Sequence, residues 1–500
     1  MSDVRATLSR RAVLGLLGAA AASAVAVACG GPPPAATPTP APAKPAEAPK
    51  PSEPTKPAEP TKPAAAAATK PAEATKPAAA AATPTAAQAT PAAAPKAPAP
   101  TPTALPPVAI KSGLPVLQYF TGLTGPDGLI MRDMVGKHNE ENAKFQVNIE
   151  IMPWVDMFAK MIAVLTAGQP LDVAIMHPAD MPQFTDNDAI LPVMEQLEPL
   201  GVKTADFLPH VLKWNEAKGK LYALPLDQHQ WNMWLRTDIA EQAGLDPKSP
   251  PKDGKTLVEW TTKMTKKTGE AFDVAGWAIG YPNPKAPMWS AIYSNGGQWY
   301  SDDGKKCTVN TPEAVEAVDW LVGLFGKASS NATDLLGDFV TGKAAMFMSG
   351  PWNIPGLLRQ QNIKFDVFQT PAMFKTQVVP ASGHSLTLPR NRDKDRLAMG
   401  AQFVKWVSDH SDLWIASGQI PVKKSILDSK AFQDAPYRKT FLDSIPNTVM
   451  WTNVKPYNEL VSPTGAERAN IELIVTKKIG VKEGLAKMEK ETNETLARAG

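Results

Sequence analysis

Cysteine is almost absent from this chain of 500 residues, which contains only Cys29 and Cys307. Two cysteines are too few for a disulfide framework or for a cysteine-based zinc site. Cys307 lies in the segment 305–309, whose pattern predicts a strand after a turn. We expect Cys307 to be a buried structural residue, and a reactive thiol is the alternative.

A strong charge of one sign is also lacking. The chain carries 52 basic and 49 acidic residues, and the part after residue 107 carries 42 basic and 44 acidic ones. No basic patch stands out, so the sequence gives no indication of a nucleic-acid partner.

Motifs for catalysis are missing as well. The chain has no G-x-S-x-G elbow, no phosphate-binding loop and no H-E-x-x-H helix. The segment Asp409-His410-Ser411-Asp412 has letters suited to a triad or a metal site, but it follows a predicted helix over 398–407 and we expect it to be solvated. A glycoside hydrolase would need two carboxylates at a fixed separation, which a sequence does not show. We therefore expect neither enzymatic activity nor a cofactor or metal ion.

Aromatic residues are absent between Pro32 and Pro107, where proline, alanine, lysine and threonine repeat with almost no branched aliphatic residue. Such a segment cannot bury enough apolar surface to offset its conformational entropy, so we expect disorder with polyproline II character. Its maximum reach would be ~240 Å at roughly 3 Å per residue. We interpret it as a spacer; an inert tail is the alternative, and its alanine runs favour some helix.

The first 28 residues have the features of an export signal. Arg10 and Arg11 precede an apolar, alanine-rich stretch from Ala12 to Ala28, and Cys29 follows. This arrangement resembles a twin-arginine lipoprotein signal peptide. It predicts a signal over 1–28, then a lipidated Cys29 and a linker over 29–107, with the protein anchored to the outer face of the cytoplasmic membrane. A transmembrane anchor and simple secretion are the alternatives.

The region from about residue 108 to residue 500 is too long for one compact core, which indicates two lobes. Apolar periodicity alternates between two and 3.6 residues, which favours βαβ units on a parallel sheet. The expected strands are 116–120, 146–152, 172–176 and 274–279. The expected helices are 128–139, 154–167, 257–268 and 311–325, followed by a mostly helical C-terminal stretch. Thr311 followed by Pro312 is a helix start signal.

Three separated segments then carry a family resemblance. They are Met152-Pro153-Trp154 with 158–173, Gly219-Lys220-Leu221-Tyr222-Ala223-Leu224-Pro225 with 234–245, and 339–352, which ends in Ser349-Gly350-Pro351-Trp352. In this order they resemble the family 1 extracellular solute-binding proteins, the maltose-binding-like receptors of bacterial ABC sugar importers. The resemblance covers residues 114 to 500.

The resemblance implies an α/β fold, the two-lobed periplasmic-binding-protein fold with hinge crossings. Lobe one would comprise 113–227 and 380–422, and lobe two would comprise 228–379 and 423–500. It also implies a small-molecule solute, an ABC permease as partner and a hinge motion that closes on the solute. We expect a monomer.

Tryptophans supply the first candidate ligand contacts, because indole rings stack on the C–H faces of sugars. The resemblance places Trp289, Trp352 and Trp451 at positions that often stack on ligand, and Trp231 follows the expected hinge at Pro225. Core packing is the alternative for each of them.

Polar candidates come from strand ends and from the hinge. Thr121 ends the first strand and His177 ends the third, where cleft loops begin. Asp227 and His229 follow the hinge strand, and the resemblance places ligand contacts near His384-Ser385. A structural role is the alternative for each histidine, and Asp227 could instead tie the hinge.

The leading hypothesis is a solute-binding lipoprotein that delivers a carbohydrate to an ABC permease. A sensory or adhesive lipoprotein is the alternative from another class. A polyamine or a phosphate ester is the alternative solute, although few basic residues stand at strand ends to bind an anion.

Overall fold

The computed structural model describes residues 107–281 and 284–499. The predicted signal peptide, Cys29 and the linker up to residue 106 lie outside the described residues. Within the described part of the chain, no helix combines the length and the apolar character needed to cross a bilayer.

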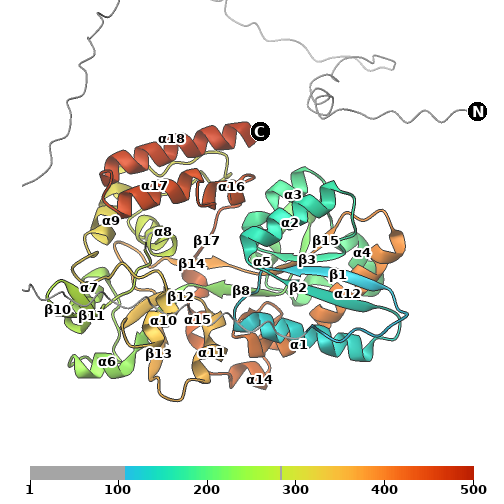
Figure 1. Ribbon diagram of the computed structural model, residues 1–500, viewed down its shortest axis with the longest axis horizontal. Coiled ribbons are helices and arrows are strands. Elements are labelled where there is room, and N and C mark those ends of the chain that lie inside the picture. The colour runs from blue at the N-terminus through green and yellow to red at the C-terminus, as the bar shows by residue number, and fades with distance from the viewer. Residues whose placement is uncertain (1–106, 282–283, 500) are drawn as a thin grey trace, which may run out of the picture. The chain divides into compact units, whose positions relative to one another are not determined.

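Strands and helices alternate along the chain (Figure 1). The strands are β1 Val116–Thr121, β2 Gln146–Ile151, β3 Val173–Met176, β4 Ile190–Leu191, β5 Glu216–Ala217, β6 Lys220–Leu221, β7 Ala223–Pro225, β8 Asp227–Gln230, β9 Asn232–Arg236, β10 Lys266–Thr268, β11 Ala271–Val274, β12 Met346–Ser349, β13 Phe365–Phe368, β14 Val379–Ser382, β15 Ser385–Pro389, β16 Ile420–Pro421 and β17 Thr448–Met450.

The α-helices are α1 Pro126–Glu141, α2 Trp154–Thr166, α3 Pro182–Asp186, α4 Met194–Leu197, α5 Pro209–Trp214, α6 Thr237–Gln242, α7 Gly254–Met264, α8 Lys285–Ser294, α9 Pro312–Val322, α10 Leu335–Val340, α11 Ile354–Leu358, α12 Lys394–Asp409, α13 Lys424–Leu427, α14 Lys430–Gln433, α15 Arg438–Asp443, α16 Tyr457–Val461, α17 Ala466–Val475 and α18 Val481–Ala499. Short 3-10 helices cover Pro178–Asp180, Glu198–Leu200, Thr204–Asp206, Pro351–Asn353, Leu413–Ser417 and Ile445–Asn447.

The first sheet has the order β2-β1-β3-β15-β4, and β7 pairs with β15. β1 runs parallel to β2 and β3, as the alternation of strands and helices predicts. β15 comes from far along the chain and runs antiparallel to β3, β4 and β7, so the sheet is mixed rather than parallel. This antiparallel return matters for the site because it brings residues around 384 next to the end of β3.

A second sheet has the order β16-β8-β14-β17. In Figure 1 it lies between a first group of elements, formed by the first sheet with α1, α2 and α12, and a second group, which contains α6, α7, α8 and α9. Its strands β8, β14 and β16 lie at the three places where the chain was expected to cross between lobes. A third sheet, β12-β9-β13, belongs to the second group. The two-lobed fold predicted from the resemblance is confirmed, while the residue bounds of the lobes stay a prediction.

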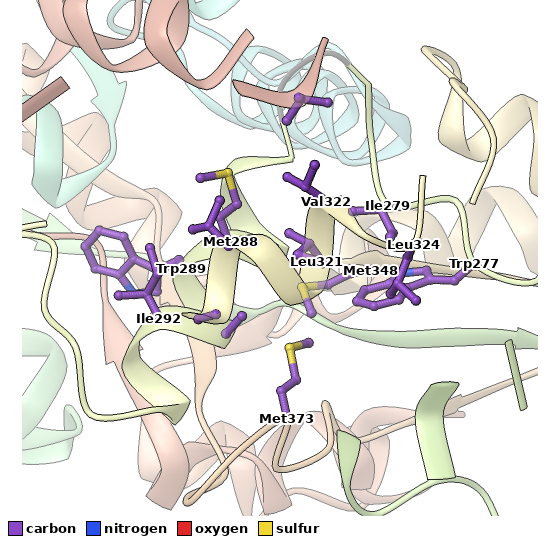
Figure 2. Packing of buried hydrophobic residues seen from close by; sticks show 14 of the residues in the cluster. Trp277, Ile279, Met288, Trp289, Ile292, Leu321, Val322, Leu324, Met348 and Met373 are labelled. Atoms are coloured by element: carbon purple, nitrogen blue, oxygen red, sulfur yellow. The ribbon is translucent and has the colours of Figure 1, made fainter. Parts of the chain in front are cut away.

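Separate apolar cores stabilise the two groups. One core packs α1 and α12 against the first sheet through residues such as Leu117, Met131 and Phe403. Another packs α8 and α9 against residues from β9, β12 and the segment around Trp277. Figure 2 shows part of this second core, with Trp289 of α8 among other apolar side chains.

Three local predictions were wrong. The helix expected over 257–268 ends at Met264, because Lys266–Thr268 pairs with Ala271–Val274 as a hairpin. The strand expected over 274–279 continues beyond Val274 only as isolated bridges, such as Ala278 with Phe347. The segment 409–412, expected to be solvated, is so only in part: Asp409 and Asp412 are exposed, but Ser411 is buried and the ring of His410 stacks on Trp406.

Cys307 is fully buried, in an isolated bridge with Tyr300. Burial raises the pKa of its thiol to about 12, so the reactive thiolate is scarce at neutral pH. The prediction of a buried, unreactive cysteine agrees with this environment.

Candidate functional site

A cavity of about 580 Å³ is the candidate ligand site. Its lining comes from the loop after β1 and the start of α1, from Trp154 and His177, and from the turn between β14 and β15. The other lining residues come from β8 and Trp231 directly after it, from α10, and from β12 and the segment after β12. The lining residues are Gly122, Leu123, Thr124, Gly125, Pro126, Asp127, Trp154, His177, His229, Trp231, Leu335, Leu336, Phe347, Ser349, Trp352, Asn353 and His384.

Strand register explains why three histidines meet in this cavity. β15 pairs Ser385 with Met176, which brings His384 opposite His177 at the end of β3. β14 pairs Ser382 with His229 on β8, two residues before His384. One ring nitrogen from each histidine therefore lies within 4.8 Å of the others, although the three residues are far apart in sequence.

The turn between β14 and β15 depends on a glycine. A Cβ atom on Gly383 would lie 2.4 Å from the carbonyl oxygen of Asp227. Such a contact is too close for any side chain, so only glycine allows this approach of the two backbones.

Asp227 lies beneath the histidines and is fully buried. Its carboxylate accepts hydrogen bonds from the backbone amide of His384 at 3.0 Å and from Nε1 of Trp414 at 2.8 Å. Nδ1 of His384 lies 2.9 Å from Oδ2, and Nδ1 of His229 lies 3.3 Å from Oδ1. Asp227 thus orients two of the three rings, and it does so from behind the cavity lining.

Burial and pairing act in opposite directions on this group. Burial alone would raise the pKa of Asp227, but His384 and His229 lower it well below its usual range, so the carboxylate is ionised. Burial would lower the pKa of His384, but Asp227 outweighs this and raises it. Burial dominates at His229 and lowers its pKa to about 3, so this ring is neutral.

The third ring, His177, is held in a similar way by the 3-10 helix Pro178–Asp180 that follows it. Its Nδ1 lies 2.9 Å from Oδ2 of Asp180, whose side chain is buried. The indole of Trp154 covers the group, with its ring centroid 4.2 Å from that of His177. It also stacks on His384 at 5.7 Å with an interplanar angle of 7°.

Four predicted tryptophans form one chain of ring contacts that leads from the cavity into the core. Trp352 contacts Trp231 at a centroid distance of 5.3 Å, and Trp231 contacts Trp451 at 5.5 Å. Trp451 in turn contacts Trp289 at 4.7 Å. Trp231 and Trp352 line the cavity, whereas Trp451 is buried behind them and Trp289 lies in the core.

Comparison with known families now identifies the chain. Residues 122–412, more than half of its length, match the family described as bacterial extracellular solute-binding protein. The chain belongs to this family. It is a family of binding proteins rather than enzymes, which agrees with the absence of catalytic motifs from the sequence.

Individual relatives of this solute-binding protein are distant. A binding protein from Brucella abortus is 24% identical over 269 residues, which cover 51% of this chain and 61% of that protein. The chain therefore spans about three fifths of the length of the first curated relatives that it matches.

Solved structures show the same fold. An ABC substrate-binding protein from Listeria monocytogenes in complex with cycloalternan has a TM-score of 0.68 at 18% identity, covering 77% of this chain and 99% of that chain. UgpB from Mycobacterium tuberculosis in complex with glycerophosphocholine also has a TM-score of 0.68, at 17% identity, covering 78% of this chain and 99% of that one.

The remaining predicted residues of this solute-binding protein lie near the cavity without lining it. Thr121 is buried, and its hydroxyl accepts a hydrogen bond from the amide of Leu123. Ser385 is buried, and its hydroxyl has no hydrogen-bond partner among the described residues. Through this hydrogen bond Thr121 shapes the loop that carries Gly122 and Leu123, whereas Ser385 begins β15 directly after His384.

Trp154 and Asp127 line the cavity, and the sequence reasoning missed both. Trp154 was counted only as the start of a helix and as part of a family motif. The signal for Asp127 was the Gly125-Pro126-Asp127 turn that opens α1 directly after the first strand. Burial raises the pKa of Asp127, although Gln419 donates to its carboxylate at 3.1 Å.

Two glycines allow the indoles to lie flat against the backbone. A Cβ atom on Gly122 would lie 2.0 Å from the ring of Trp154, and one on Gly350 would lie 1.9 Å from the ring of Trp352. Each glycine therefore fixes how deeply an indole sits in the cavity wall.

Proposed function

We propose that this chain is an exported lipoprotein that captures a carbohydrate in the cavity and delivers it to an ABC permease. The observation that carries the proposal is the lining of three indoles, Trp154, Trp231 and Trp352, beside polar groups. Indole faces suit the C–H faces of a sugar ring, and imidazole and carboxylate groups suit its hydroxyls. The sugar-bound structure with the same fold supports this class of solute.

Capture would involve closure of the two lobes. We place lobe one at 113–227 with 380–422, and lobe two at 228–379 with 423–500. β8, β14 and β16 are the crossing strands, and a solute that contacts both lining groups stabilises the closed state. A sensory or adhesive role would use the same cavity; a permease gene next to this one would favour transport, and its absence would weaken the transport role.

A phosphate ester is the alternative suggested by the glycerophosphocholine complex. The lining offers it little, since no lysine or arginine is among the described residues around the cavity. Bidentate arginine contacts or helix-end amides are the usual partners of phosphate. A polyamine is better matched, because Asp127 and the indoles would attract a cation.

A thermal-shift screen tests the choice of solute. The full chain carrying Cys29→Ser, kept in EDTA, is screened against mono-, di- and oligosaccharides, polyamines, amino acids and phosphate esters. A ligand at 100 times its Kd stabilises the native state by about 2.7 kcal/mol. We expect hits among sugars, with binding weakened at least ~10-fold in Trp352→Ala.

Trp320→Ala is the matched control, because Trp320 packs on Phe374 and does not line the cavity. Hits only among polyamines or phosphate esters would replace the carbohydrate, and equal affinity in Trp352→Ala would remove Trp352 from the site. A cooperative melt without any hit would favour the sensory or adhesive role.

The lipid anchor is tested by fractionation. We expect the wild-type chain in the membrane fraction, because more than one acyl chain on Cys29 would hold it there stably. Cys29→Ser should move the exported protein into the soluble fraction, while Cys307→Ser should leave it in the membrane. Continued membrane association of Cys29→Ser after a salt wash would contradict lipidation.

A further inference from the structure

We propose that His177, His229 and His384 form a binding site for a divalent transition-metal ion, Zn²⁺ or an ion of similar preference, inside the cavity. The proposal rests on the proposed function in one respect, since it names a ligand of the same cavity. It contradicts our expectation from sequence that the chain binds no metal.

The first support is the convergence of three imidazoles. One ring nitrogen of each histidine lies within 4.8 Å of the others. Three nitrogens around a tetrahedral Zn²⁺ at ~2.0–2.1 Å would be about 3.3 Å apart. The nitrogens would therefore have to approach one another by up to about 1.5 Å when an ion binds. Imidazole is a ligand that Zn²⁺, Ni²⁺ and Cu²⁺ all accept.

The second support is the set of carboxylates behind the rings. Asp180 contacts Nδ1 of His177, and Asp227 contacts Nδ1 of both His229 and His384. Metal-binding histidines usually donate their other ring nitrogen to a carboxylate in this way, which fixes the ring and increases its basicity. With Nδ1 donating, a neutral ring presents the lone pair of Nε2, and Nε2 has no partner among the described residues.

The third support is the charge of the surroundings. Asp127 lines the cavity and Asp227 lies beneath it, while no lysine or arginine is among the described lining residues. A cation therefore meets attractive charge from the cavity wall. An anionic solute would meet repulsion from the same groups.

A metal ion also satisfies the three nitrogens better than a sugar hydroxyl does. A hydroxyl carries one proton and satisfies one acceptor, so three neutral rings with convergent lone pairs would need three separate donors. A metal ion accepts three lone pairs at once and keeps an open position. That position would face the cavity, where Trp231 and Trp352 form part of the wall, and it would take water or a solute oxygen.

The test is a titration with metal alone. The full chain carrying Cys29→Ser, without a histidine tag, is stripped with EDTA, dialysed and titrated with Zn²⁺ by calorimetry and with Co²⁺ by visible absorption. We expect one equivalent to bind, with the intense visible bands of four- or five-coordinate Co²⁺. His177→Ala and His229→Ala should each weaken binding by about 100-fold or more, and Asp180→Asn by about 10- to 100-fold.

His410→Ala is the control, because His410 contacts Trp406 away from the cavity. Absence of saturable binding, or equal loss in His410→Ala and His177→Ala, would overturn the proposal. If His229→Ala does not fold, His177→Ala decides, because 23% of the His177 side chain is exposed. Solute screening in EDTA and metal titration without solute separate the two proposals: sugar binding without metal binding would overturn only this one.

Discussion

Asp227→Ala is expected to lower the free energy of unfolding by about 3–5 kcal/mol, the cost of removing one partner from a buried charged network. The carboxylate is fully buried and ionised, and it faces the amide and ring of His384, the ring of His229 and the indole N–H of Trp414. Alanine would leave these groups buried without an acceptor, and each such group has its own desolvation cost.

Asp133→Ala is the matched control, since Asp133 is exposed on α1 and surface substitutions usually stay within about 0.5 kcal/mol. The measurement is urea-induced unfolding followed by fluorescence and by circular dichroism. Asp227→Asn should retain part of the loss, because its amide oxygen still accepts hydrogen bonds while the charge is gone. A loss below about 1 kcal/mol in Asp227→Ala would show that the network does not stabilise the fold.

The Asp227→Asn variant separates two roles of Asp227. A residue that only ties the hinge would lower stability and leave the three histidine rings free to bind metal. A residue that also orients His229 and His384 would weaken metal binding in the fraction that is still folded. Measuring Zn²⁺ affinity of Asp227→Asn under native conditions therefore tells whether the hinge contact and the site are coupled.

Periodicity predicted the first five elements of the fold well. The strands and helices from Val116 to Met176 lie within two residues of their expected bounds, because each has one buried face and a clear period. The helix from Leu257 was expected to continue past Met264, and no periodic signal marked the change. After the helix the chain forms the hairpin β10-β11 from mostly exposed residues, and Gly269, with a φ of 60°, permits the tight turn between these two strands.

The candidate site was predicted less completely than the fold. The structure joins all four predicted indoles in one chain of contacts. Only Trp231 and Trp352 line the cavity, and ligand contact by any of the four stays a prediction. The side of α8 that Trp289 occupies could not be read from the sequence, because this helix is buried on nearly every face. The cluster of histidines depends on the register of β15 against β3, a contact between residues more than 200 positions apart.

Glu467→Ala is also expected to lower the free energy of unfolding by about 3–5 kcal/mol, because Glu467 belongs to a second buried charged network. Glu467 of α17 is fully buried and accepts from Nζ of Lys285 at 2.5 Å, from Nε1 of Trp299 at 3.1 Å and from the hydroxyl of Tyr300. Burial alone would lower the pKa of Lys285, but Glu467 and Tyr457 outweigh burial and raise it. Removing the carboxylate leaves a buried cation without its partner.

The sign of the pH dependence follows from Lys285. Its pKa is higher in the folded state, so its contribution is fully present below its unfolded value of ~10.4 and is lost as the pH rises through the folded value. The wild-type protein should therefore lose none of this contribution between about pH 6 and pH 9. The deficit of Glu467→Ala should shrink as the pH rises, because burial alone lowers the pKa of Lys285 and the unpaired ammonium can lose its proton. Glu472→Ala on the same helix is the control, and it should have little effect because Glu472 is not fully buried.

A double substitution shows whether the pair or its cavity determines the loss. Replacing both partners of a buried ion pair by apolar residues of similar size is often neutral or stabilising, so Lys285→Met with Glu467→Leu should recover part of the stability. The remainder would stay lost, because Trp299 and Tyr300 also donate to Glu467 and would lack an acceptor. The ammonium of Lys285 also lies 5.4 Å from the ring of Trp451, which contacts Trp231 in the cavity wall. If the double variant recovers stability but binds solute more weakly, the ion pair positions the indole wall; if it recovers both, the pair serves the core alone.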